Sequence, residues 1–215
     1  MRKMWMWLLG AVVVLGLGVA GICAERRTAV SRYQESFDFE AARKYQEALD
    51  ALDKVSPNAG EKYFLELRRG WLHYLLGQTD EAIGSYERAA DLEPKAVEPL
   101  LGKMLPEMAA RRWADVEKSA RAVLELDPGN YTALSRQAYS LYLLKNYKEA
   151  EGVYRAVLGL YPSDATMKSG LAWSLFMQGK KDDAARLFGE VLAIYPYYAT
   201  AAQGREAARG GSRLP

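Results

Sequence analysis

The chain has 215 residues, of which 50% are hydrophobic and 26% are charged, so it can bury a substantial core, and disorder of most of the chain is excluded. Its 29 Lys and Arg residues nearly balance 27 Asp and Glu residues, and no basic stripe is visible that would neutralise the phosphates of a nucleic acid. Nucleic acid is therefore not an expected partner, and the single cysteine, Cys23, excludes an internal disulfide.

An apolar helix is predicted over residues 4–24, which contain no charged side chain. At about 1.5 Å per residue, a helix of this length spans the roughly 30 Å of a membrane's hydrocarbon core. We interpret the segment as a single-pass membrane anchor, with Trp5 and Trp7 at the headgroup boundary. The alternative is an export signal cleaved near Ala24, which would leave the protein periplasmic or secreted. Basic residues flank both ends, so the side of the membrane stays open.

The sequence contains little that indicates a cofactor site, a metal site or a catalytic site. Residues 16–21 match the G-x-G-x-x-G dinucleotide fingerprint, but this fingerprint requires a βαβ unit with an acidic residue about 20 positions later. The residues that follow, 37–43, are helical in pattern instead. The single histidine, His73, is expected to be structural or solvated. The sequence thus predicts no cofactor, no metal site and no enzymatic activity.

A helical hairpin is predicted over residues 25–57. Residues 39–49 have a helical pattern, and Pro57 is expected to end this helix because proline cannot continue one. The preceding helix would run almost directly out of the apolar segment. The hairpin therefore connects the predicted anchor to the rest of the chain.

A repeat with a period of about 34 residues follows over residues 63–198, and a fixed period in this range is typical of a solenoid. Prolines, small residues and aromatic residues recur in the same phase. The recurring positions are Gly70, Met104, Ala138 and Ala172; Ala82, Val116, Ala150 and Ala184; Tyr86, Ala120, Tyr154 and Phe188; and Pro94, Pro128, Pro162 and Pro196. Small residues let the two helices of a hairpin approach closely, and the aromatic residues are expected to fill the space between successive hairpins.

These columns resemble the tetratricopeptide repeat, and the resemblance covers about two-thirds of the chain. It implies an all-α fold, a right-handed superhelical solenoid of antiparallel helix hairpins, preceded by the one apolar helix. The hairpin at 25–57 resembles a degenerate further unit, since the interval from Pro57 to Pro94 is longer than the interval between the later prolines. The units implied by the resemblance are 63–96, 97–130, 131–164 and 165–198.

Two features modify this pattern. Pro106 falls inside the first helix of the second unit, where a proline costs about 3 kcal/mol or produces a kink, so a bend is expected there. Residues 199–209 are predicted to form a capping helix, because the last hairpin of a solenoid otherwise exposes an apolar face. Residues 210–215 form a short tail.

In the family that the sequence resembles, the first helix of each hairpin lines a concave surface that binds peptides or helices of partner proteins. Here the corresponding side chains form two rows that are mostly aromatic: Trp71, Leu105, Tyr139 and Trp173, then Tyr74, Met108, Tyr142 and Phe176. Aromatic side chains dominate many binding surfaces. Arg68 and Arg136 lie on the adjacent edge, where they are expected to hold a carboxylate. The alternatives are core packing of the rings and solvation of the arginines.

The sequence therefore predicts a membrane-tethered scaffold or adaptor that binds a segment of a partner protein in an aromatic-lined groove, in complex assembly. The alternative is a self-assembling structural protein that oligomerises through its repeats. The family's clamp for acidic C-terminal peptides uses Lys and Asn residues that this face lacks, so binding of that type is not expected.

Overall fold

The computed structural model describes residues 30–56, 58 and 60–210, and all regular structure in these ranges is helical. The predicted all-helical stack of hairpins is confirmed for this part of the chain. The apolar helix predicted at residues 4–24 lies outside it. Among the residues described, no helix is both long enough and apolar enough to cross a membrane.

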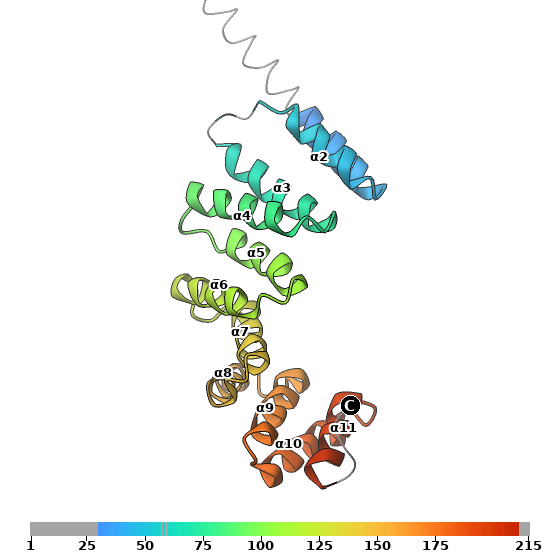
Figure 1. Cartoon of the computed structure of the whole chain (residues 1–215), viewed down its shortest axis with the longest axis vertical. Helices are drawn as coiled ribbons and strands as arrows, with labels where there is room; N and C mark the ends of the chain where they lie inside the picture. Colours follow the sequence, from blue (N-terminus) through green and yellow to red (C-terminus); the bar gives the residue numbers. More distant parts are fainter. Residues whose placement is uncertain (1–29, 57, 59, 211–215) are drawn as a thin grey trace, which may run out of the picture. The chain divides into compact units, whose positions relative to one another are not determined.

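The chain divides into two compact units, residues 1–93 and 94–215, which we call the N-terminal unit and the C-terminal unit. Figure 1 labels helices α2 to α11. The described helices of the N-terminal unit are residues 30–41, α2 (Tyr45–Asp53), α3 (Lys62–Leu75) and α4 (Thr79–Leu92). Those of the C-terminal unit are α5 (Glu98–Ala109), α6 (Trp113–Leu126), α7 (Tyr131–Leu143), α8 (Tyr147–Leu160), α9 (Ala165–Met177), α10 (Lys181–Ile194) and α11 (Ala199–Ala208).

The turn inside each hairpin contains one residue with a positive φ. Gly77 and Gly179 have φ values of 74° and 80°, which suits glycines just past a helix end. Arg43, Arg111 and Lys145 take the same conformation, with φ values of 58°, 56° and 65°. These five positions follow one another at intervals of one repeat period. The hairpin that contains α2 is therefore in phase with the repeats at its turn, although Pro57 precedes by three positions the place, residue 60, that corresponds to Pro94.

Aromatic rings pack on glycines where successive hairpins meet in the C-terminal unit. A Cβ atom on Gly170 of α9 would lie 2.5 Å from the ring of Tyr154 of α8. A Cβ atom on Gly204 of α11 would lie 2.2 Å from the ring of Phe188 of α10. The prediction that these rings fill the space between hairpins is confirmed. Helix α11 packs on α10, and its predicted role as a polar cap stays a prediction.

The small residues predicted at the helix crossings are buried. Their side chains leave room for the backbone of the neighbouring helix, so the core is continuous within the hairpins. The fully buried alanines of these columns are Ala82, Ala138, Ala150, Ala172 and Ala184.

Helix α5 carries Pro106 in its interior, near its end, as predicted. Because proline has no N–H, the carbonyl of Gly102 loses its usual helical donor. The carbonyl of the neighbouring Leu101 accepts a hydrogen bond of 2.8 Å from Arg136 of α7. The bend expected at Pro106 stays a prediction.

Candidate functional site

A pocket of about 660 Å³ lies in the C-terminal unit, mainly between α7, α9 and α11. Helix α7 contributes Ser135, Arg136, Tyr139 and Tyr142 to its lining. Helix α9 contributes Thr166, Met167, Ser169, Gly170, Trp173 and Met177. The other lining residues are Met108 of α5, Tyr154 of α8, and Tyr198, Thr200 and Gln203 at the start of α11.

The helical period explains why these side chains meet. Residues 135, 139 and 142 of α7 lie about one turn apart on one face, and residues 166, 169 and 173 likewise share one face of α9. The Tyr198 hydroxyl donates a hydrogen bond of 3.1 Å to Thr166 Oγ1, which joins the start of α11 to α9. The pocket is therefore a product of the repeat together with the capping helix.

Aromatic contacts position the pocket's rings. Trp173 packs edge-on against Phe176 and Phe188, with ring centroids 5.6 and 5.3 Å away. Tyr139 meets the ring of Trp113 edge-on at 5.8 Å, yet 45% of its surface is exposed. Trp173 is thus anchored in the core by its neighbours, while Tyr139 offers its ring to a ligand.

Two polar atoms at the pocket are buried and unpaired. Ser169 Oγ and Trp173 Nε1 have no hydrogen-bond partner among the described residues, and Ser169 is only 3% exposed. A buried donor without a partner costs about 1–3 kcal/mol. A ligand that brings an acceptor to these atoms would recover this free energy.

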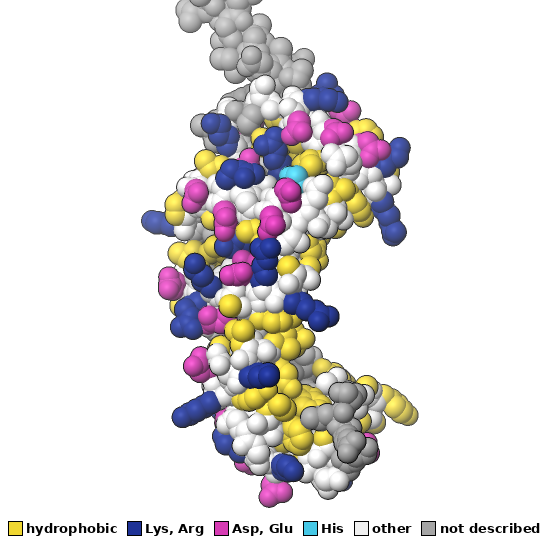
Figure 2. All heavy atoms as spheres, in the orientation of Figure 1, with side chains coloured by type: hydrophobic (Ala, Val, Ile, Leu, Met, Phe, Trp, Pro, Cys, Tyr) yellow, Lys and Arg dark blue, Asp and Glu magenta, His cyan; other side chains and the backbone are white. Residues whose placement is uncertain are grey.

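Of the described residues that line the pocket, Arg136 alone carries a full charge at neutral pH, and its guanidinium donates to the Leu101 carbonyl. Burial raises the pKa of Tyr142 and of Tyr154 above the usual value, so both hydroxyls stay neutral. In the space-filling view, hydrophobic side chains gather over α7 and α9 (Figure 2).

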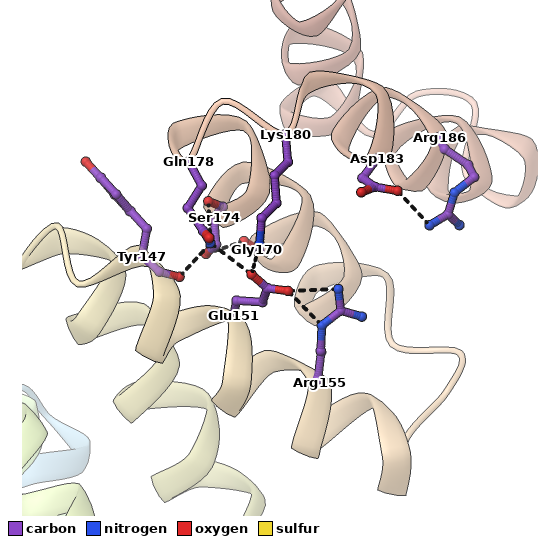
Figure 3. Close-up of polar contacts among 9 residues, drawn as sticks. All are labelled: Tyr147, Glu151, Arg155, Gly170, Ser174, Gln178, Lys180, Asp183 and Arg186. Carbon is purple, nitrogen blue, oxygen red and sulfur yellow. Dashed lines mark hydrogen bonds and ion pairs between the residues drawn. The ribbon is translucent and has the colours of Figure 1, made fainter.

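A polar network fixes α9 against α8 (Figure 3). The Glu151 carboxylate of α8 accepts hydrogen bonds from Lys180 (2.9 Å), Arg155 (2.9 Å) and Gln178 (3.0 Å). The bond from Lys180 first, and then those from Arg155 and Gln178, outweigh burial and lower the pKa of Glu151 to about 2. Gln178 also donates to the Tyr147 carbonyl, at 3.1 Å. Since Gln178 and Lys180 follow directly after α9, this network holds the pocket wall in place.

The predicted binding residues divide between the two units. Five of them line the pocket of the C-terminal unit: Met108, Arg136, Tyr139, Tyr142 and Trp173. Phe176 packs behind Trp173 instead of lining the pocket. Arg68, Trp71 and Tyr74 lie on α3 of the N-terminal unit.

In the N-terminal unit, these side chains have partners within the chain. Arg68 is 7% exposed and forms an ion pair with Glu40. The Trp71 indole donates a hydrogen bond of 2.7 Å to the same carboxylate, and its ring lies 5.7 Å from that of Tyr74. The carboxylate that Arg68 holds thus belongs to its own chain, and we leave Arg68 out of the proposed binding site.

Several lining residues, in particular Ser169 and the side chains of α11, are not among the binding residues predicted from the sequence. Thr200 and Gln203 lie one repeat period after Thr166 and Ser169, so the repeat spacing itself contained the signal. The prediction of residues 199–209 as a capping helix does not use this spacing.

No cluster of three or more His, Cys, Asp or Glu side chains suitable for a metal ion occurs in the described part of the chain. His73 lies on α3, where its Nδ1 is 2.6 Å from Gln78 Oε1. This contact gives the histidine a structural role at the end of its helix.

Comparisons with known proteins agree with this fold. Tetratricopeptide repeat models match residues 66–96, 107–165 and 146–199, and no curated protein matches the sequence. A crystal structure of a tetratricopeptide repeat protein from Parabacteroides merdae is similar, with a TM-score of 0.78 and 20% identity over 86% of this chain and 73% of that one.

Structures titled MamA are also similar. One has a TM-score of 0.69 and 13% identity, covering 87% of this chain and 98% of that one. MamA from Desulfovibrio magneticus has a TM-score of 0.67 and 20% identity, covering 71% and 86%. At these identities the likeness concerns the fold. The repeat models, which match more than half of the residues, show that the chain belongs to the tetratricopeptide repeat family.

Proposed function

We propose that this protein is a scaffold that binds a segment of a partner protein in the pocket between α7, α9 and α11. The observation that carries the proposal is an apolar, aromatic-lined pocket with unpaired buried polar atoms. Its volume of about 660 Å³ lies within the range of roughly 300–1,000 Å³ typical of ligand sites. Exposed aromatic side chains such as Tyr139 provide contact area at low entropic cost.

The binding residues that we propose are Met108, Arg136, Tyr139, Tyr142 and Trp173, together with Ser169. Trp173 and Tyr142 form the apolar wall, and Tyr139 offers the exposed edge. Trp71 and Tyr74 belong to the equivalent face of the N-terminal unit, which we propose as a secondary contact surface.

The proposal is tested by the Tyr139→Ala/Tyr142→Ala double variant of the full chain, purified in detergent and used for affinity capture of partners. We expect loss of capture with unchanged helicity in far-UV circular dichroism. The matched control is Tyr197→Ala, which removes a 98% exposed tyrosine outside the pocket. Capture that persists in the double variant would contradict the assignment of the pocket.

We also propose that residues 4–24 tether this scaffold to a membrane as a single-pass anchor. The support is the length of this uncharged run and the basic residues on both sides of it. The full chain is expected to remain with the membrane during alkaline extraction. A soluble protein whose first residue follows Ala24 would instead establish export after cleavage.

A second candidate function is self-assembly, which is favoured by an exposed apolar row. Leu126, Leu160 and Ile194 recur at the repeat period near the ends of α6, α8 and α10, and Leu160 and Ile194 are 58% and 63% exposed. Exposed apolar side chains that recur on successive hairpins are candidates for an interface. The full chain in detergent, studied by analytical ultracentrifugation at micromolar concentration, should then form oligomers that Leu160→Ser/Ile194→Ser dissociates. A monomeric wild-type protein would rule out self-assembly at that concentration.

A further inference from the structure

A carboxyl group lies in the interior of the hairpin that α5 and α6 form. Glu107 of α5 is only 2% exposed, and its Oε1 accepts a hydrogen bond of 3.0 Å from Ser119 Oγ of α6. Its Oε2 is buried and has no hydrogen-bond partner among the described residues. One of the two oxygens of this acid is therefore removed from water without a donor in its place.

The repeat shows that Glu107 and Ser119 stand at positions of the apolar core. One and two repeat periods later, the equivalent residues are aliphatic and pack in the core of their own hairpins. They are Leu141 and Val153 in the hairpin of α7 and α8, and Leu175 and Leu187 in the hairpin of α9 and α10. The hairpin of α5 and α6 thus has an acid and a hydroxyl group where the two following hairpins have a pair of aliphatic side chains.

The surroundings of Glu107 oppose its negative charge. Burial raises the pKa of the Glu107 carboxyl group above its ordinary value of 4.5. Lys103 of the same helix, whose Nζ lies 3.7 Å from Oε1, and the hydrogen bond from Ser119 lower this pKa, whereas the Asp115 carboxylate of α6 raises it. Because burial is the largest of these effects, the folded hairpin keeps the proton at pH values at which an exposed glutamate has lost it.

We propose that Glu107 makes the packing of α5 on α6 sensitive to pH, because the core holds the neutral acid and the ionised form loosens the hairpin. An ionised carboxylate with an unpaired oxygen is costly in the interior, and this cost falls when the hairpin opens and admits water. Pro106 precedes Glu107 and deprives the Gly102 carbonyl of its helical donor, so α5 has one internal hydrogen bond fewer to resist opening.

The same hairpin contributes to the pocket between α7, α9 and α11. Met108, the residue after Glu107, lines this pocket, and Arg136 of the pocket donates a hydrogen bond of 2.8 Å to the Leu101 carbonyl of α5. Opening of the hairpin therefore displaces the part of the pocket wall that α5 supplies. The sensitivity to pH goes beyond the proposed function and does not depend on it, since it is a property of the hairpin with or without a partner.

The direction of the pH dependence follows from the raised pKa of the folded state. Below pH 4.5 the Glu107 carboxyl group is neutral in both the folded and the opened hairpin, so its contribution to stability is fully present. As the pH rises from 4.5 through the pKa of the folded state, the opened hairpin releases the proton more readily than the folded hairpin does. The stability of the hairpin is therefore lost as pH rises.

The test is native-state hydrogen exchange of the full chain in detergent micelles, measured between pH 4.5 and pH 8 and corrected for the intrinsic exchange rate. Relative to Glu107→Gln, which is neutral at every pH, the amides of α5 and α6 in the wild type should lose protection about fivefold or more as pH rises. The amides of α9 and α10 are the internal reference and should show no such loss. The matched control Glu125→Gln changes an exposed glutamate of α6 and should retain the pH dependence of the wild type.

Two further variants assign the effect to the buried pair. Ser119→Ala removes the donor to the ionised acid, so the loss of protection should become larger and continue to a higher pH. Glu107→Leu/Ser119→Val gives the hairpin the side chains found between α7 and α8 and should abolish the pH dependence, which also provides a neutral reference if Glu107→Gln folds poorly. An equal pH dependence in the wild type and in the neutral variants would overturn the proposal, because Glu107 would then keep one charge state, as in a permanent ion pair with Lys103.

Discussion

Replacing each of the two equivalent tryptophans by phenylalanine should destabilise the protein to different extents. Trp71→Phe and Trp173→Phe remove the same atoms, so the loss of packing is similar to a first approximation. Trp71 Nε1 donates to the Glu40 carboxylate at 2.7 Å, whereas Trp173 Nε1 is buried without a partner among the described residues. A hydrogen bond to a charged group contributes about 1.5–3 kcal/mol, and removal of an unpaired buried donor recovers about 1–3 kcal/mol.

We therefore expect Trp71→Phe to cost at least about 2 kcal/mol more than Trp173→Phe. Native-state hydrogen exchange measured by mass spectrometry is the appropriate assay, because it reports α3 and α9 separately within the full chain. The opening free energy of α3 in Trp71→Phe is compared with that of α9 in Trp173→Phe, each relative to wild type. Equal losses, or a larger loss for Trp173→Phe, would refute the view that one indole is satisfied and the other is not.

Three further predictions concern the C-terminal unit and are measured by hydrogen exchange or thermal unfolding. Gly204→Ala should destabilise α11 by about 1–3 kcal/mol, because its Cβ atom would lie 2.2 Å from the Phe188 ring. The control Gly152→Ala should not destabilise the protein, because no heavy atom lies within 4 Å of its Cβ position. Lys145→Gly should stabilise the protein by about 0.5–1 kcal/mol, because glycine adopts the positive φ of this position without steric strain. Destabilisation of the protein would contradict this account. The pKa of Glu151 is lowered from 4.5 to about 2, so its stabilisation is present above pH 4.5 and is lost as pH falls towards 2. The shift corresponds to about 3.4 kcal/mol, of which solvent screens a part, so the loss should be about 2 kcal/mol and absent in Glu151→Gln.

Much of the fold was predictable because every repeat imposes the same packing problem on the sequence. Small residues must recur where helices cross, and prolines must recur where a hairpin ends. The phase of the first hairpin was harder to predict from the sequence. Pro57 suggested a shifted register, whereas the positive φ of Arg43 places that hairpin's turn in phase with Gly77. A single sequence does not reveal which non-glycine residue has a positive φ.

The aromatic face was predictable as well, but the fate of each side chain on it was not. Arg68 and Arg136 occupy equivalent repeat positions, yet Arg68 is buried against Glu40 of the helical segment 30–41. Periodicity assigns a residue to a face of its helix, while the neighbouring helix decides whether that face is covered. The same reason explains why the unpaired state of Ser169 and Trp173 emerged only from the structure.

Site-specific photo-crosslinking tests the proposed binding pocket most directly. Tyr139, which is 45% exposed, is replaced by p-benzoylphenylalanine in the full-length protein in cells, and Tyr197, which is 98% exposed outside the pocket, is replaced in a control. We predict a discrete crosslinked partner from position 139 that is absent from position 197 and is lost when Tyr142→Ala is added. No crosslink from position 139, or the same crosslink from both positions, would contradict partner binding in this pocket.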